Sequence, residues 1–223
     1  MLERDPFGVN RDTELFKTEM TKHNLSIDEE NKLVSVFRQV SLCNLLINNI
    51  PELNHSNYIK GFIYDILNSI ISALERRERY LQLNFRSMVE HVARISLNKT
   101  YKGGEFDQTV RTKDFEFLKK TIVDEGWAYL HNVYVNACHY VHSSPQAKLK
   151  VSSRFNSLVQ GDSNSTRHNM INNLFKVVSA LMKVIVKYYH EKLADIFFRN
   201  PKDLTKLMGK SLYSYYSSFF PIE

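Results

Sequence analysis

The sequence predicts an all-α protein, a helical bundle of five or six helices, and three observations support this. The chain has 223 residues but only 7 glycines and 5 prolines, whereas an all-β chain of this length needs many turns rich in both. Apolar residues make up 43% of the chain and recur mostly at helical spacing. The length suits one domain spanning residues 1–223, with no need for a second core.

The N-terminal part contains one clear helix start. Residues 1–12 are expected to be loosely ordered, with a first helix from near Thr13. Ser26 followed by Glu29 predicts a capping box, in which each side chain accepts the other residue's backbone amide. We expect the helix that follows to end near Pro51.

A second pair of helical segments is predicted from about Ser56 onwards. A wide apolar stripe runs to residue 74 and periodicity resumes at Leu81. Between them the charged segment 75–79 is either a solvated continuation of the helix or a tight corner. Lys102 and the two glycines after it break the pattern.

The C-terminal half alternates helical and polar segments. Residues 112–142 are predicted to form a helical region that Gly126 divides. Residues 143–165 are predicted to form a polar connection with a short helix around 147–159. A long closing helix is expected over 166–199, and an aromatic tail over 213–223 that packs on the body or on a second subunit. We expect the helices at 57–100 and 112–142 to form the core pair.

Charge and cysteine content limit the environment and the partners. The net charge of +6 and pI of about 9.2 are compatible with a polyanionic partner such as RNA. Cys43 and Cys138 are too far apart for a disulfide framework or a zinc ribbon, which favours free thiols in a reducing cytoplasm. No stretch reaches the roughly 18 apolar residues of a membrane helix, so no membrane span is expected.

The most informative stretch contains Arg86, Glu90 and His91 within an apolar helix. Arg86 and Glu90 are four residues apart, so they share a helical face and can form an ion pair. Arg86 and His91 are five apart and serve one site only if that site spans the edge of the helix.

A second stretch places His139 and His142 near the end of the next helical region. A protonated histidine there interacts favourably with the helix dipole, which suits it to proton transfer. The alternative is a pair of half-buried, hydrogen-bonded histidines. Neither stretch supplies a full ligand set for a metal.

Together the two stretches resemble a pattern of HEPN-type proteins from bacterial defence and toxin systems. Arg86, Ser87 and Glu90 match the segment "RS-apolar-apolar-E", and residues 140–142 match a helix ending in "Y-V-H". The resemblance covers residues 57–144, and Arg86 with His91 also fits the R-x4-6-H signature of HEPN ribonucleases.

The resemblance implies a dimeric helical bundle that cleaves RNA without a metal or other cofactor, through the substrate's own 2′-hydroxyl. It implies that Arg86 stabilises the developing charge on phosphorus and that a histidine, His91 or His142, moves the proton. Ser87 departs from the motif, which has Asn, Asp or His at that position, and this leaves the two histidines as rivals. Glu90 completes the expected catalytic set. The side chains expected to bind RNA are Arg76, Arg77, Arg79, Lys102, His139 and Tyr140.

Three functional hypotheses follow. The first is an endoribonuclease, the effector of an anti-phage or toxin–antitoxin system, with RNA as substrate and an antitoxin or defence protein as partner. The second is a catalytically silent interaction module that binds a protein or a nucleotide. The third is a metal-dependent enzyme that uses His139, His142 and a carboxylate.

Overall fold

The computed structural model describes residues 5–101, 106–148, 155–156, 161 and 165–220. Within these residues the chain is helical and contains no strand, which confirms the all-α class. The described part contains eight α-helices, more than the five or six expected. The helices are α1 (Val9–Met20), α2 (Ile27–Asn49), α3 (Ser56–Leu74), α4 (Glu78–Thr100), α5 (Thr112–Thr121), α6 (Trp127–Val141), α8 (Arg167–Phe197) and α9 (Pro201–Ser217).

The first helix begins earlier in the chain than the sequence suggested. Helix α1 starts at Val9, because the carboxylate of Asp5 accepts the amides of Asn10 and Arg11 at 2.9 and 3.1 Å. The expectation that 1–12 is loosely ordered is therefore wrong for residues 9–12, and residues 1–4 lie outside the described part.

The predicted capping box at the start of α2 is confirmed. The hydroxyl of Ser26 accepts the amide of Glu29 at 3.3 Å, and the Glu29 carboxylate accepts the amide of Ser26 at 2.8 Å.

The charged segment 75–79 is a tight corner. Helix α3 ends at Leu74 and α4 begins at Glu78. Arg76 adopts the left-handed region with φ of 55°, and the amide of Arg77 donates to the carbonyl of Ser72 at 2.7 Å. The chain therefore reverses here, and α3 and α4 pack side by side with the corner's arginines at one end.

Two segments raise the helix count. Helix α5 ends at Thr121, a short 3-10 turn follows, and Gly126, with φ of 71°, precedes α6, so residues 112–142 form two helices. Residues 213–217 of the aromatic tail are the end of α9, and residues 221–223 lie outside the described part. Phe219 stacks on His190 with ring centroids 4.6 Å apart, so the described part of the tail packs on the body. The short helix expected around 147–159 lies mostly outside the described residues.

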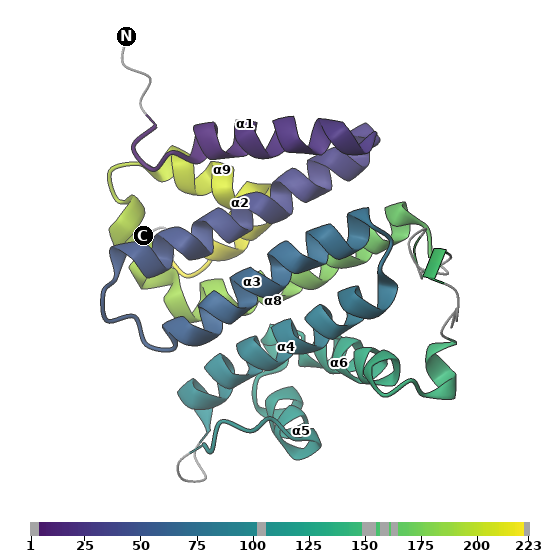
Figure 1. Cartoon of the computed structure of the whole chain (residues 1–223). Coiled ribbons are helices and arrows are strands. Elements are labelled where there is room, and N and C mark those ends of the chain that lie inside the picture. Colours follow the sequence, from purple (N-terminus) through teal and green to yellow (C-terminus); the bar gives the residue numbers. More distant parts are fainter. Residues whose placement is uncertain (1–4, 102–105, 149–154, 157–160, 162–164, 221–223) are drawn as a thin grey trace.

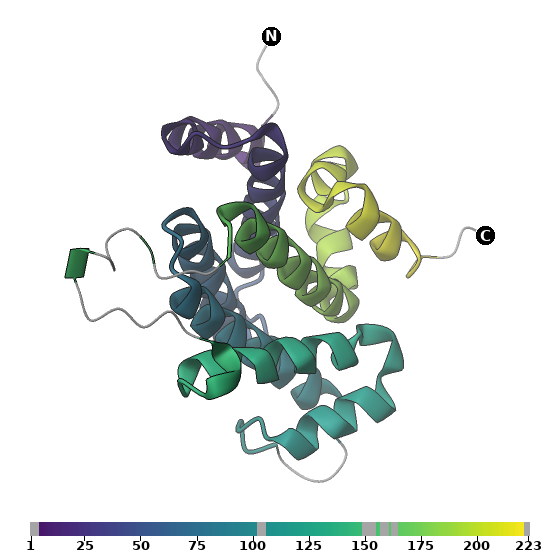
Figure 2. The same ribbon diagram turned by 90° about the vertical axis from the view of Figure 1, so that its right-hand side faces the viewer.

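The centre of the fold is α8, whose buried side chains face several layers. Figures 1 and 2 show α1, α2 and α9 at one end of the molecule and α4, α5 and α6 at the other, with α8 running between them. The expected pair, 57–100 and 112–142, packs closely through α3 with α4 and α4 with α6, and α8 joins this pair to α2 and α9 in one core. Among the described helices only α8 is long and apolar enough to cross a membrane, and 56% of that stretch is buried inside the fold.

Candidate functional site

Arg86 faces α6 and forms the predicted pair with Glu90. Its Nη1 lies 3.6 Å from Glu90 Oε2, and Glu90 Oε1 lies 3.6 Å from Nη2 of Arg94. Arg86 Nη2 also donates to the hydroxyl of Tyr134 at 3.4 Å, with the guanidinium carbon 5.4 Å from the ring centroid. This cluster joins α4 to α6 through the two terminal nitrogens of Arg86, while its buried Nε has no hydrogen-bond partner among the described residues.

His91 lies on the opposite side of α4, against α3. Its Nε2 is 3.5 Å from Oδ2 of Asp65 and 3.4 Å from the hydroxyl of Ser87. The ring covers Gly61 so closely that a Cβ added there would come within 2.4 Å of Nε2. Arg86 and His91 therefore do not converge on one site within a single chain, because the helix separates them.

The electrostatics of this contact favour neutral groups. Burial, with a smaller contribution from the nearby Arg94 cation, lowers the pKa of His91 to about 4. Burial also raises the pKa of Asp65, against the lowering effect of the hydrogen bond from Ser87. His91 is thus a neutral, largely buried imidazole at pH 7, which suits a packing role between α3 and α4.

The end of α6 presents the other candidate histidines. His139 Nδ1 lies 2.9 Å from the hydroxyl of Ser144. His142 caps α6, is exposed, and makes no side-chain hydrogen bond with a described residue. In the first turn of α4, Nη2 of Arg79 donates to the carbonyl of Val141 at 3.3 Å. Arg79 is therefore anchored to the residue that directly precedes His142.

This meeting of Arg79 with the end of α6 was missed by sequence reasoning, which treated Arg79 only as an RNA-binding cation. A signal was present, because Arg79 lies seven residues before Arg86 and so occupies the same face of α4. What the sequence did not contain was the pairing of α4 with α6 in space.

The remaining predicted binding residues lie around the same corner. The Tyr140 hydroxyl donates to the carboxylate of Glu78 at 3.2 Å, and burial, then the charge of Glu78, raises the pKa of Tyr140. Arg76 is exposed at the corner, Arg77 is half-buried beside it, and Lys102 lies outside the described residues.

We define the corner surface as Arg79, Tyr80, Leu83, Val141 and His142. The first four line a shallow hollow of about 270 Å³. Tyr80 also lines a neighbouring hollow of about 340 Å³ between α3 and α4, so its side chain borders both hollows. Its ring is 60% exposed. The corner surface thus combines a cation, an exposed aromatic ring and an exposed histidine.

A buried carboxylate, Glu125, holds the start of α6, and no pattern in the sequence pointed to it. Glu125 accepts the Ser96 hydroxyl at 3.0 Å and the Trp127 indole at 2.5 Å through one oxygen. Its other oxygen accepts the Tyr188 hydroxyl at 2.5 Å and lies 3.2 Å from Nζ of Lys187. The network holds α6 against α4 and α8, and so positions the corner surface.

The described residues supply no ligand set for the metal-dependent hypothesis. Within the residues that the structure describes, no three His, Cys, Asp or Glu side chains gather as metal ligands would. The two cysteines are free, and burial raises the pKa of Cys43 to about 12.

Comparison of the chain with models of protein families, with curated proteins and with solved structures gives no match.

Proposed function

We propose that this chain binds RNA at the corner surface and cleaves it without a metal, with His142 moving the proton and Arg79 contacting the phosphate. One observation carries the proposal: the guanidinium of Arg79 is held on the carbonyl of Val141, next to the exposed His142. The HEPN-like resemblance supports the same chemistry, and we propose that it takes place at the end of the α4–α6 pair instead of at Arg86 and His91, which face different helices.

The reaction needs few groups. The 2′-oxygen of a ribose attacks the neighbouring phosphorus, the bond to the 5′-oxygen breaks, and a cyclic phosphate and a free 5′-hydroxyl result. A histidine takes the proton from the attacking hydroxyl, and a protonated histidine gives one to the leaving oxygen. Arginine offers planar, permanently charged donors to the phosphate, and the exposed ring of Tyr80 offers a stacking face for a base.

The resemblance implies a homodimer, and a dimer supplies what one corner surface lacks. In a dimer that pairs two corner surfaces, each copy contributes one His142, so that one acts as base and the other as acid. Arg86, Glu90 and His91 then act as positioning residues, since they hold α4 against α6 and α3.

Cleavage of a labelled RNA in excess EDTA tests the proposal. We expect His142→Ala to lower the cleavage rate by about 100-fold or more, the usual contribution of general acid–base catalysis, with RNA affinity nearly unchanged. Arg79→Ala should weaken both affinity and rate. The matched controls are His55→Asn, at the far end of α3 where Asn tolerates the φ of 67°, and Arg199→Ala beyond α8. A His142→Ala protein that cleaves RNA at the native rate would refute the catalytic role of His142.

A second candidate is the silent interaction module, and the apolar side chains near the corner favour it. Ile71, Tyr80 and Leu83 are 59%, 60% and 44% exposed on adjoining helices. If native protein leaves RNA intact but a Leu83→Glu variant loses binding to a partner protein or to a second copy, the interaction-module hypothesis replaces the ribonuclease hypothesis.

A further inference from the structure

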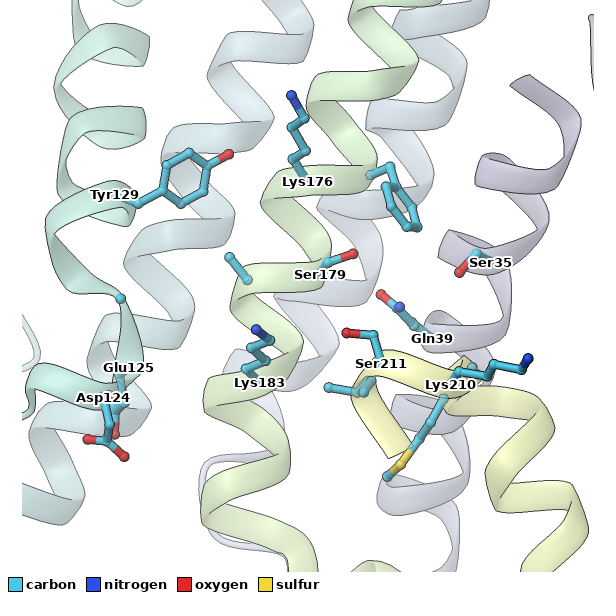
Figure 3. A pocket seen from close by; sticks show the side chains of 16 residues that line it. Ser35, Gln39, Asp124, Glu125, Tyr129, Lys176, Ser179, Lys183, Lys210 and Ser211 are labelled. Atoms are coloured by element: carbon cyan, nitrogen blue, oxygen red, sulfur yellow. The ribbon is translucent and has the colours of Figure 1, made fainter. Parts of the chain in front are cut away.

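A pocket far from the corner surface has features of a ligand site. It has a volume of about 570 Å³ and opens between α2, α8, the second half of α9 and the turn before α6 (Figure 3). This size falls within the range of roughly 300–1,000 Å³ typical of small-molecule sites. Most of its lining lies outside residues 57–144, and none of it belongs to the corner surface.

The backbone of α9 breaks where it meets this pocket. Gly209 has φ of 69° and ψ of 168°, values outside the helical region, so α9 consists of two helical segments. A new helical segment therefore begins with Lys210 and Ser211, and the first amides of a helical segment have no acceptor within it. Amides at the start of a helical segment attract anions. Gly209, Lys210 and Ser211 all line the pocket.

An independent observation points to a ligand. Gln39 is only 3% exposed, and its Oε1 has no hydrogen-bond partner among the described residues. Buried amides are normally hydrogen-bonded, because an unpaired one loses its contacts with water without replacement. Figure 3 shows the amide of Gln39 directed into the pocket, near the hydroxyls of Ser179 and Ser211.

The charge of the pocket favours an anion. Lys176, Lys183 and Lys210 line it, and none of them forms an ion pair with a described residue. Lys183 lies over the ring of Tyr215, 6.0 Å from its centroid. The two carboxylates at the opposite rim, Asp124 and Glu125, are both paired with Lys187, at 2.8 and 3.2 Å.

We propose that this pocket binds a small organic phosphate. The phosphate would contact Lys183, Ser211 and the amides after Gly209, and a hydroxyl or amino group of the same molecule would donate to Gln39. The rings of Tyr129 and Phe175 provide an apolar wall for the rest of the ligand. This site is independent of RNA cleavage.

Calorimetric titration with four probes tests the proposal: inorganic phosphate, ribose 5-phosphate, adenosine 5′-monophosphate and adenosine. We expect both organic phosphates to bind at least about tenfold more tightly than inorganic phosphate. Gln39→Leu should reduce their affinity about tenfold without lowering the Tm of the free protein, because leucine has a similar size and removes the unpaired buried oxygen. Lys183→Ala should weaken all phosphate binding, and the matched control Lys192→Ala, exposed on the same helix outside the pocket, should not.

Three results would overturn the proposal: neither organic phosphate binds at about 10 mM, adenosine binds as tightly as its monophosphate, or Gln39→Leu binds like the native chain. The titrations contain no RNA and are repeated with His142→Ala. Failure of the proposed RNA cleavage and failure of the proposed phosphate binding are therefore observed in separate experiments.

Discussion

Gly61 lies directly under the ring of His91, and replacing it with alanine tests how α3 and α4 pack. In an open helix, Gly→Ala stabilises the folded state by about 1 kcal/mol. Here the new Cβ would lie 2.4 and 2.6 Å from Nε2 and Cε1 of His91, distances that force the ring to move. The ring has little room, because its side chain is only 20% exposed beside Asp65.

The magnitude follows from two opposing effects. Overpacking a closely packed contact costs about 1–3 kcal/mol, and the gain in helix propensity offsets about 1 kcal/mol of this. We therefore expect Gly61→Ala to destabilise the native chain by about 1 kcal/mol, from the same two estimates. In a His91→Ala background the clash is gone, so the same change should stabilise by about 1 kcal/mol.

Urea unfolding of the four proteins of this double-mutant cycle measures the coupling, expected to be about 2 kcal/mol. Thermal unfolding should show the same signs, at about 2–4 °C per kcal/mol for a chain of this size. If Gly61→Ala stabilises the native chain as it would an open helix, His91 does not pack on α3, and its exclusion from catalysis loses its basis.

Two further predictions concern buried polar groups. The folded pKa of His91, about 4, lies below the unfolded value of about 6.5. The stability that neutral His91 contributes is therefore complete above pH 6.5 and declines towards pH 4, by at most about 3 kcal/mol. His91→Gln should flatten the curve of unfolding free energy against pH in this window, and parallel curves for the two proteins would contradict the burial argument. Glu125→Ala removes the carboxylate that accepts from Ser96, Trp127 and Tyr188, and leaves Lys187 paired with Asp124 alone. It should destabilise the chain by about 3–5 kcal/mol in urea unfolding. The exposed Asp124→Ala should cost less than about 1 kcal/mol, and equal losses would show that the network does not hold α6.

Features set by neighbouring residues were predictable. The capping box of Ser26 and Glu29, the break at Gly126 and the pairing of Arg86 with Glu90 all involve groups within four residues of each other. Helical geometry fixes such contacts before the chain folds further. The start of α1 was missed because its amides are accepted by Asp5, which precedes the helix by several residues.

By itself, therefore, the sequence determined the all-helical class, most helix starts and the candidate side chains of the α4–α6 pair. Only the tertiary structure decided which of these side chains meet, because each such contact depends on how separate helices pack. It separated Arg86 from His91 by turning them toward different neighbours, and it anchored Arg79 beside His142. It also placed Gln39 at a pocket shared with α8 and α9, a grouping that no local pattern in the sequence contains.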